Sequence, residues 1–203
     1  MRKTNRRERG FTLLESVVVI AILMILMGIA VVQSFGSLEG YQVNSAQDIV
    51  VSQLRVARQL AISQRRFVTV TFNTGANPPS LTYQVQPRQG SGDAPVPAVT
   101  VTLPRQTKFT QEGVADTPMG FGTCGGSNGV CIGGVGGGPA IMQFTSMGQF
   151  TDGTGVNTLN GTVFVGIPSQ VPTARAVTIM GSTGRVRPYT YALSSASTGS
   201  WTE

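Results

Sequence analysis

Arg9-Gly10-Phe11-Thr12-Leu13-Leu14-Glu15 leads almost directly into an apolar run that covers residues 17–32. Within residues 11–32 the only charged side chain is Glu15. A helix of this length measures about 33 Å, which matches the hydrocarbon core of a bilayer. The segment therefore predicts a membrane-spanning helix over residues 11–35, and the remaining parts of the fold follow it in the sequence.

The residues before this helix are strongly basic. Residues 1–10 hold five basic side chains and one acidic side chain, so they contribute +4 of the net charge of +6. The rest of the chain has ten basic and eight acidic residues and contributes +2. A positive flank stays in the cytoplasm, so we expect one membrane pass with the C-terminal part outside the cytoplasm. An ordinary secretory signal is cut after its apolar region. Here the small residue Gly10 precedes that region, and cleavage there would leave the helix on the mature protein.

Glu15 lies about one turn inside the apolar segment, where an unpaired carboxylate is costly. If the chain is cut between Gly10 and Phe11, the new amine of Phe11 on a neighbouring subunit is a suitable partner. The alternative is a glutamate at a helix end that reaches the polar interface of the membrane. The residues alone leave both interpretations open.

The stretch from Arg9 to Glu15, with its apolar continuation, resembles the class III leader of type IV pilins and type II secretion pseudopilins. The resemblance covers about the first 32 residues. It implies cleavage after Gly10 by a prepilin peptidase, N-methylation of Phe11, and a role of Glu15 in assembly with other pilin subunits. It also implies a single-pass protein of the bacterial inner membrane whose periplasmic part ends in a pilus or pseudopilus.

Residues 41–66 have the pattern of an amphipathic helix. Their apolar positions recur at spacings of three and four, which places them on one helical face. Two glycines within residues 35–40 are able to soften the join to the membrane segment. We expect one long stem helix with an apolar half and an amphipathic half. The apolar positions are Val43, Ala46, Val50, Leu54, Ala57 and Ala61.

Strand patterns dominate residues 67–203. Threonine alternates with valine or phenylalanine, which is typical of sheets with one buried face. A helix followed by such strands predicts an α+β, pilin-like fold, with the stem helix packed on a C-terminal antiparallel sheet or sandwich. The expected strands are residues 67–72, 81–85, 99–103, 140–144, 161–166, 176–180 and 185–191.

Glycine is concentrated in the second half of the chain. Residues 113–161 hold 15 of the 26 glycines, and no strand of ordinary length fits residues 120–139, so we expect a glycine-rich loop over residues 113–139. Cys124 and Cys131 lie inside it. Outside the cytoplasm a disulfide between them is the natural interpretation, and two free thiols are the alternative. A zinc site needs four ligands, and these two cysteines have no histidine to join them.

Three segments add a resemblance to GspH/FimT-type minor pilins: residues 54–65, residues 144–149 (Phe-Thr-Ser-Met-Gly-Gln) and residues 184–187 (Gly-Arg-Val-Arg). In the minor pilins of natural transformation the Gly-Arg-x-Arg element is associated with DNA, which implies that Arg185 and Arg187 contact double-stranded DNA. On a strand both guanidinium groups would share one face and suit phosphate oxygens. The alternative is that these arginines protect an exposed strand edge.

The sequence offers little for catalysis. It has no histidine, and the only lysine beyond residue 10 is Lys108, so nucleophilic catalysis lacks its usual base. We expect neither an enzyme nor a cofactor or metal site. Two functions compete: a structural minor subunit of a pilus or of a type II secretion pseudopilus, and a filament-borne adaptor for DNA uptake. Possible helpers of the adaptor are Arg105, Lys108 and Arg175.

Overall fold

The computed structural model describes residues 12–88, 90, 92–94, 96–111, 114, 117, 118, 121, 124, 128–133, 135, 136, 141–153, 156–193 and 199–203. For residues 31–37, 135 and 136 it describes the backbone only. The chain divides into two compact units, Met1–Leu38 and Glu39–Glu203.

Helix α1 spans Leu13–Gln64 and contributes to both units. It begins at Thr12, whose side-chain oxygen accepts a hydrogen bond from the backbone N–H of Glu15 at 3.3 Å. This contact satisfies one of the free amides of the first turn. It ends at Arg65, which has a φ of 52° and lies in the left-handed region. The backbone N–H of Arg66 bonds the carbonyl of Ala61, as in the Schellman motif that closes many helices.

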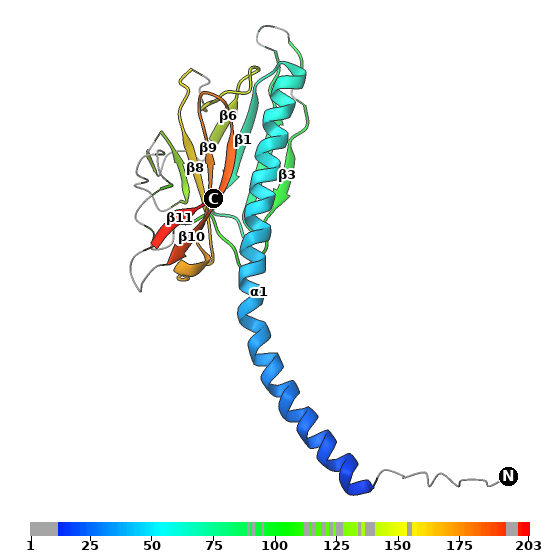
Figure 1. Ribbon diagram of the computed structural model, residues 1–203. Coiled ribbons are helices and arrows are strands. Elements are labelled where there is room, and N and C mark those ends of the chain that lie inside the picture. The colour runs from blue at the N-terminus through cyan, green and yellow to red at the C-terminus, as the bar shows by residue number, and fades with distance from the viewer. Residues whose placement is uncertain are drawn as a thin grey trace, which may run out of the picture. The chain divides into compact units, whose positions relative to one another are not determined.

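Two antiparallel sheets follow α1 (Figure 1). One has the strand order β3-β2-β1-β6-β7, and the other has the order β11-β10-β9-β8-β4-β5. The strands are β1 (Val68–Asn73), β2 (Ser80–Val85), β3 (Val99–Thr102), β4 (Val130–Ile132), β5 (Val135–Gly136), β6 (Ile141–Phe144), β7 (Phe150–Asp152), β8 (Gly161–Val165), β9 (Arg175–Ile179), β10 (Val186–Leu193) and β11 (Gly199–Thr202), with a short 3₁₀ helix at Val171–Thr173.

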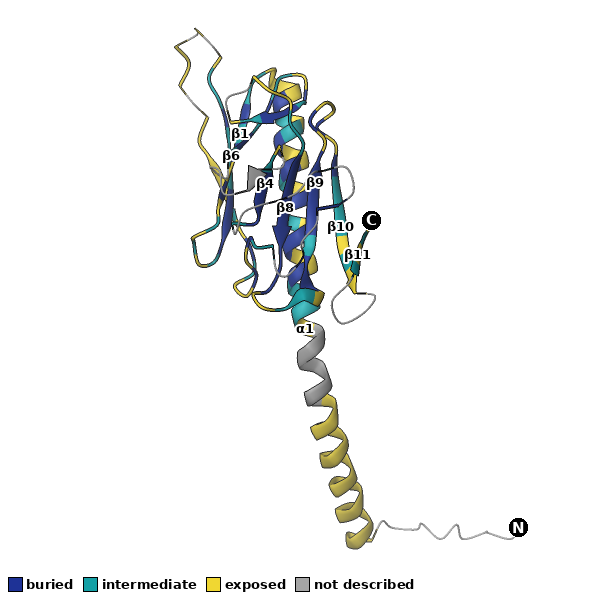
Figure 2. Cartoon of the chain, turned by 90° about the vertical axis from the view of Figure 1, so that its left-hand side faces the viewer, coloured by how far each residue is buried: buried dark blue, intermediate teal, exposed yellow. Residues whose placement is uncertain are grey.

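The main core lies between the second half of α1 and both sheets. All six apolar positions expected on this helical face are fully buried, and Figure 2 shows that the second half of α1 carries both buried and exposed residues. Phe144 and Phe150 meet edge to face at 5.7 Å between ring centroids, and the backbone N–H of Phe150 bonds the carbonyl oxygen of Gly181, in the turn between β9 and β10 of the other sheet. The helix and the two sheets of this unit therefore share one hydrophobic core.

A smaller cluster occupies the second sheet. It is formed by Cys124, Cys131, Phe164 and Ala176, with Tyr189 and Trp201 packed against it. Phe164 and Val165 are consecutive buried residues of β8, and only Val165 belongs to the main core. Successive strand residues face opposite sides of a sheet, so this cluster lies on the side away from α1. The sheet is therefore covered on both faces.

The α+β prediction is confirmed, and the helix runs through residues 35–40 without interruption. Each expected strand is present to within one or two residues of its predicted ends. The sequence did not predict β7 or β11. It also treated residues 120–139 as loop, whereas β4 and β5 lie there. These two strands have three and two residues, and they form because β4 pairs with β8 through Val130, Cys131 and Ile132.

Candidate functional site

The first candidate site is the beginning of α1. Gly10 and Phe11, the expected processing site, lie outside the described residues. Glu15 is exposed in the first turn of the helix, where a carboxylate interacts favourably with the helix dipole. It lies within a segment, Leu13–Ala30, that is long and apolar enough to cross a membrane, with a mean hydropathy of 2.7.

The described side chains of this segment are all exposed, from Leu13 at 82% to Val19 at 45%. Such a continuous apolar surface is stable only in lipid or against other apolar helices. Glu15 is its single carboxylate. The beginning of α1 therefore has the chemistry of an anchor or a packing helix with one charged position.

The second candidate site is built where two turns meet α1. Gly148, in the turn between β6 and β7, accepts a hydrogen bond from Nε of Arg58 at 3.2 Å. Gly184, in the turn between β9 and β10, also lies against Arg58, because a Cβ atom added there would come within 2.9 Å of Nε. Both glycines have positive φ values, 77° and 62°. The two turns thus hold the Arg58 side chain in place.

Beside this junction is an open recess with a volume of about 660 Å³, which we call the arginine groove. Three arginines line it: Arg55 and Arg58 on α1, and Arg185, which immediately precedes β10. Its other lining residues are Gln59, Ile62, Ser63, Gly184 and Val186. The groove has no acidic residue in this lining, so it concentrates positive charge.

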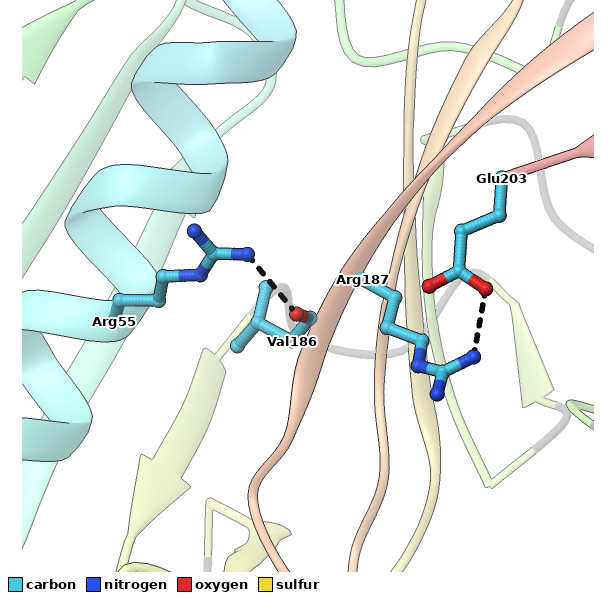
Figure 3. Close-up of polar contacts among 4 residues, drawn as sticks. All are labelled: Arg55, Val186, Arg187 and Glu203. Atoms are coloured by element: carbon cyan, nitrogen blue, oxygen red, sulfur yellow. Dashed lines mark hydrogen bonds and ion pairs between the residues drawn. The ribbon is translucent and has the colours of Figure 1, made fainter.

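Arg187 lies elsewhere on the surface. Its Nη1 contacts Oε2 of Glu203 at 2.7 Å, and the two side chains are 34% and 51% exposed. Figure 3 shows Arg187 directed toward Glu203, while Arg55 reaches the carbonyl oxygen of Val186 from the helix at 3.5 Å. The structure therefore places Arg185 in the groove and gives Arg187 an acidic partner, which the sequence did not predict.

The three expected helpers do not join this site. Arg175 donates from Nε to Oδ1 of Asn44 at 3.0 Å, and burial lowers the pKa of its guanidinium group. Lys108 pairs with Gly166 through its backbone, and Arg105 lies in a turn after β3. None of them lines the arginine groove.

The cysteines of the glycine-rich region form a disulfide between Cys124 and Cys131. Both are buried in the smaller cluster, at 8% and 2% exposure. The bond therefore ties a loop residue to β4 and serves packing. Within the described part of the chain, no group of three or more histidine, cysteine or acidic residues is placed to hold a metal ion.

Residues 5–31 match the model of the prokaryotic N-terminal methylation motif. The N-terminal segment of the chain therefore carries this methylation motif. Two crystal forms of the type IV minor pilin FimU from Pseudomonas aeruginosa are similar to it, each at 16% sequence identity. One has a TM-score of 0.48 and covers 78% of this chain and 92% of that chain. The other has a TM-score of 0.45, with 71% and 90% covered. No curated protein matches this chain in sequence.

The prepilin motif accounts for the beginning of α1 but not for the arginine groove, which sequence reasoning missed. Arg55 and Arg58 lie within residues 54–65, which entered the sequence analysis only as a segment of resemblance and not as candidate site residues. Their spacing of three residues, which makes them neighbours on the helix surface, was the available signal. Gly184 and Arg185 are more than 120 residues from Arg55 and Arg58 in sequence. No local pattern predicts that they lie beside α1, because the packing of the sheet brings them there.

Proposed function

We propose that this chain is a minor subunit of a type IV pilus, held in the inner membrane by the first part of α1 until it enters the filament. The main supporting observation is the methylation motif at residues 5–31, which contains the apolar segment Leu13–Ala30 with its one carboxylate, Glu15. Exposed apolar side chains along that helix favour lipid first and neighbouring helices afterwards.

Processing follows from the position of the motif. A prepilin peptidase cuts between Gly10 and Phe11, and the new amine of Phe11 is N-methylated. The basic residues 1–10 keep this end in the cytoplasm until cleavage, since positive flanks are retained there. The unit Glu39–Glu203 then lies on the periplasmic side, which is also where a disulfide persists.

Glu15 is the residue that selects a neighbour. In a filament of packed apolar helices its carboxylate loses most of its water, and an unpaired buried charge is expensive. The amine of Phe11 on an adjacent subunit supplies the opposite charge. Correct addition of a subunit is thereby favoured over additions that leave both charges without partners.

The test is incorporation of Glu15→Ala into filaments, with Asp48→Ala as a control that removes an exposed carboxylate from the same helix outside the membrane segment. Glu15→Ala should reach the membrane and be processed normally, yet be missing from sheared filaments. Asp48→Ala should be incorporated like the wild type. Normal incorporation of Glu15→Ala would refute the proposed mechanism.

The alternative filament is the pseudopilus of type II secretion, because the leader resembles those of both systems. Deletion of the gene separates the two. Loss of surface pili with normal protein export supports a pilus subunit, whereas an export defect with normal pili supports the pseudopilus.

A second candidate function is DNA contact through Arg185 and Arg187. The observation in its favour is that Arg185 is exposed beside two further arginines of α1. Because Glu203 already neutralises Arg187, we expect Arg185→Ala to weaken binding more than Arg187→Ala does. The test is a titration of the full chain in lipid nanodiscs with double-stranded DNA at two salt concentrations, since phosphate contacts weaken as salt rises. Equal losses in the two variants, or no binding, would argue against this contact.

A further inference from the structure

The arginine groove is rich in hydrogen-bond donors that have no acidic partner. The ion pairs among the described residues are Arg66–Asp93 and Arg187–Glu203, and neither includes an arginine of the groove. The bond from Arg58 to Gly148 uses Nε, which leaves the two terminal amino groups of this guanidinium for another acceptor.

Part of the groove is preorganised. Gly148 and Gly184 approach Arg58 so closely that its side chain is held between two turns. Arg55 lies one turn earlier on the same side of α1. A planar guanidinium held in this way is suited to bidentate contact with a carboxylate, because little side-chain freedom is lost on binding.

We propose that the arginine groove binds an acidic segment of a neighbouring protein in the filament. This inference depends on the proposed role as a filament subunit, which supplies such a neighbour at high local concentration. Ile62 and Val186 give the groove an apolar component for the methylene groups of a glutamate. Arg55 and Arg58 then receive its carboxylate.

The size and the charge of the site favour a peptide over a nucleic acid. A recess of about 660 Å³ admits side chains or a short segment, whereas a DNA duplex is too wide to enter it. Beyond residues 1–10 the chain has ten basic and eight acidic residues, so the positive charge is local and does not form the extended patch expected for nucleic acid. DNA contact would use the exposed Arg185 at the surface, so it should depend less on Arg55 and Arg58 than peptide binding does.

The experiment measures fluorescence polarisation of a labelled oligoglutamate peptide with the full chain in nanodiscs of zwitterionic lipid. An oligoglutamine peptide of equal length and a labelled DNA duplex are the parallel probes. The variants are Arg55→Gln with Arg58→Gln, the single variant Arg55→Gln in case Arg58 is needed for folding, and Arg105→Gln as an exposed arginine outside the groove.

We expect oligoglutamate to bind and oligoglutamine not to bind. The double variant should weaken oligoglutamate binding by about tenfold or more, and Arg55→Gln alone by a smaller factor, as expected for charge-assisted contacts. Arg105→Gln should leave it unchanged. The inference would be overturned if oligoglutamine bound as well as oligoglutamate, or if Arg105→Gln weakened oligoglutamate binding as much as the double variant does. It would also be overturned if Arg55→Gln weakened binding of the DNA duplex more than binding of the peptide. Filament incorporation of Glu15→Ala is unaffected by these results, so failure of the groove and failure of the filament proposal are distinguishable.

Discussion

Gly184 is a position where a single added methyl group should be strongly destabilising. It has a φ of 62°, and a Cβ atom there would overlap the backbone carbonyl oxygen of Gly148. The same atom would come within 2.9 Å of Nε and 3.1 Å of Cδ of Arg58. Gly184→Ala therefore forces a backbone, and not merely a flexible side chain, to move.

The expected cost has two parts. A residue other than glycine in the left-handed region costs about 1–2 kcal/mol. Displacing packed neighbours to admit an extra carbon costs about 1–3 kcal/mol more. Gly184→Ala should thus lower the free energy of unfolding by about 2–5 kcal/mol, which is a large share of the 5–15 kcal/mol typical of folded domains.

Two other glycines separate these parts. Gly90 has a φ of 80° and nothing within 4 Å of its added Cβ atom, so Gly90→Ala isolates the backbone term. The Cβ of Gly148→Ala would meet Cδ1 of Ile62 at 2.6 Å, which is the far end of a side chain that is able to rotate away. We expect the losses to increase from Gly90→Ala through Gly148→Ala to Gly184→Ala.

The assay is urea unfolding of the full chain in detergent micelles, followed by fluorescence of the single tryptophan, Trp201. This residue packs on Phe164 at 5.9 Å and Tyr191 at 5.1 Å between ring centroids, so its emission reports on the second sheet. If Gly184→Ala unfolds at the same urea concentration as Gly90→Ala, the reasoning from close approach is wrong.

Three further predictions concern other contacts. Gln47→Ala should cost about 1–3 kcal/mol by the same assay, because this buried amide bonds carbonyl oxygens of both β9 and β10 at 3.1 and 3.0 Å. Reducing the Cys124–Cys131 disulfide of the wild type should cost about 2–3 kcal/mol, the entropy of closing a short loop, and replacing both cysteines with serine should cost at least as much, because their hydroxyl groups would be buried in an apolar cluster. Glu203→Gln should strengthen binding of an anionic probe at Arg187 by no more than about fivefold, because an exposed ion pair is worth at most about 1 kcal/mol. The measurement is fluorescence polarisation of the labelled probe. A larger gain would show that the ion pair does more than screen charge.

The helix and most strands were predictable because their signals are local. Val43, Val50 and Leu54 repeat with the helical period, and burial of that face follows from the pattern alone. β4, β5, β7 and β11 were missed because they are short, and β4, β5 and β7 also lie among glycines, where composition favours loops. Their formation depends on neighbours such as β8 and β10, whose positions no local pattern reveals.

The candidate sites divide in the same way. Glu15 and the prepilin motif are contiguous in sequence, so they were visible before the structure. The expectation that Arg185 and Arg187 act together assumed that both lie on one strand, whereas Arg185 precedes β10. It also had no means of finding Glu203, which pairs with Arg187 across 16 residues of chain. The arginine groove joins α1 to a turn near residue 184, and only the packed sheets bring these segments together.

The glycines beside the groove bear on how its arginines are interpreted. Gly148 and Gly184 belong to two of the three segments that resemble the minor pilins, and both contact Arg58, which lies in the third. The close packing of these two turns on α1 relies on glycine at both positions, and any ligand-binding role of the groove depends on that packing. A loss of binding on changing either glycine therefore says nothing about a ligand, whereas a loss in Arg55→Gln with unchanged unfolding does. Arg55 is therefore the best position for testing ligand binding. It lines the groove, but unlike Arg58 it is not among the atoms that lie closest to Gly148 or Gly184.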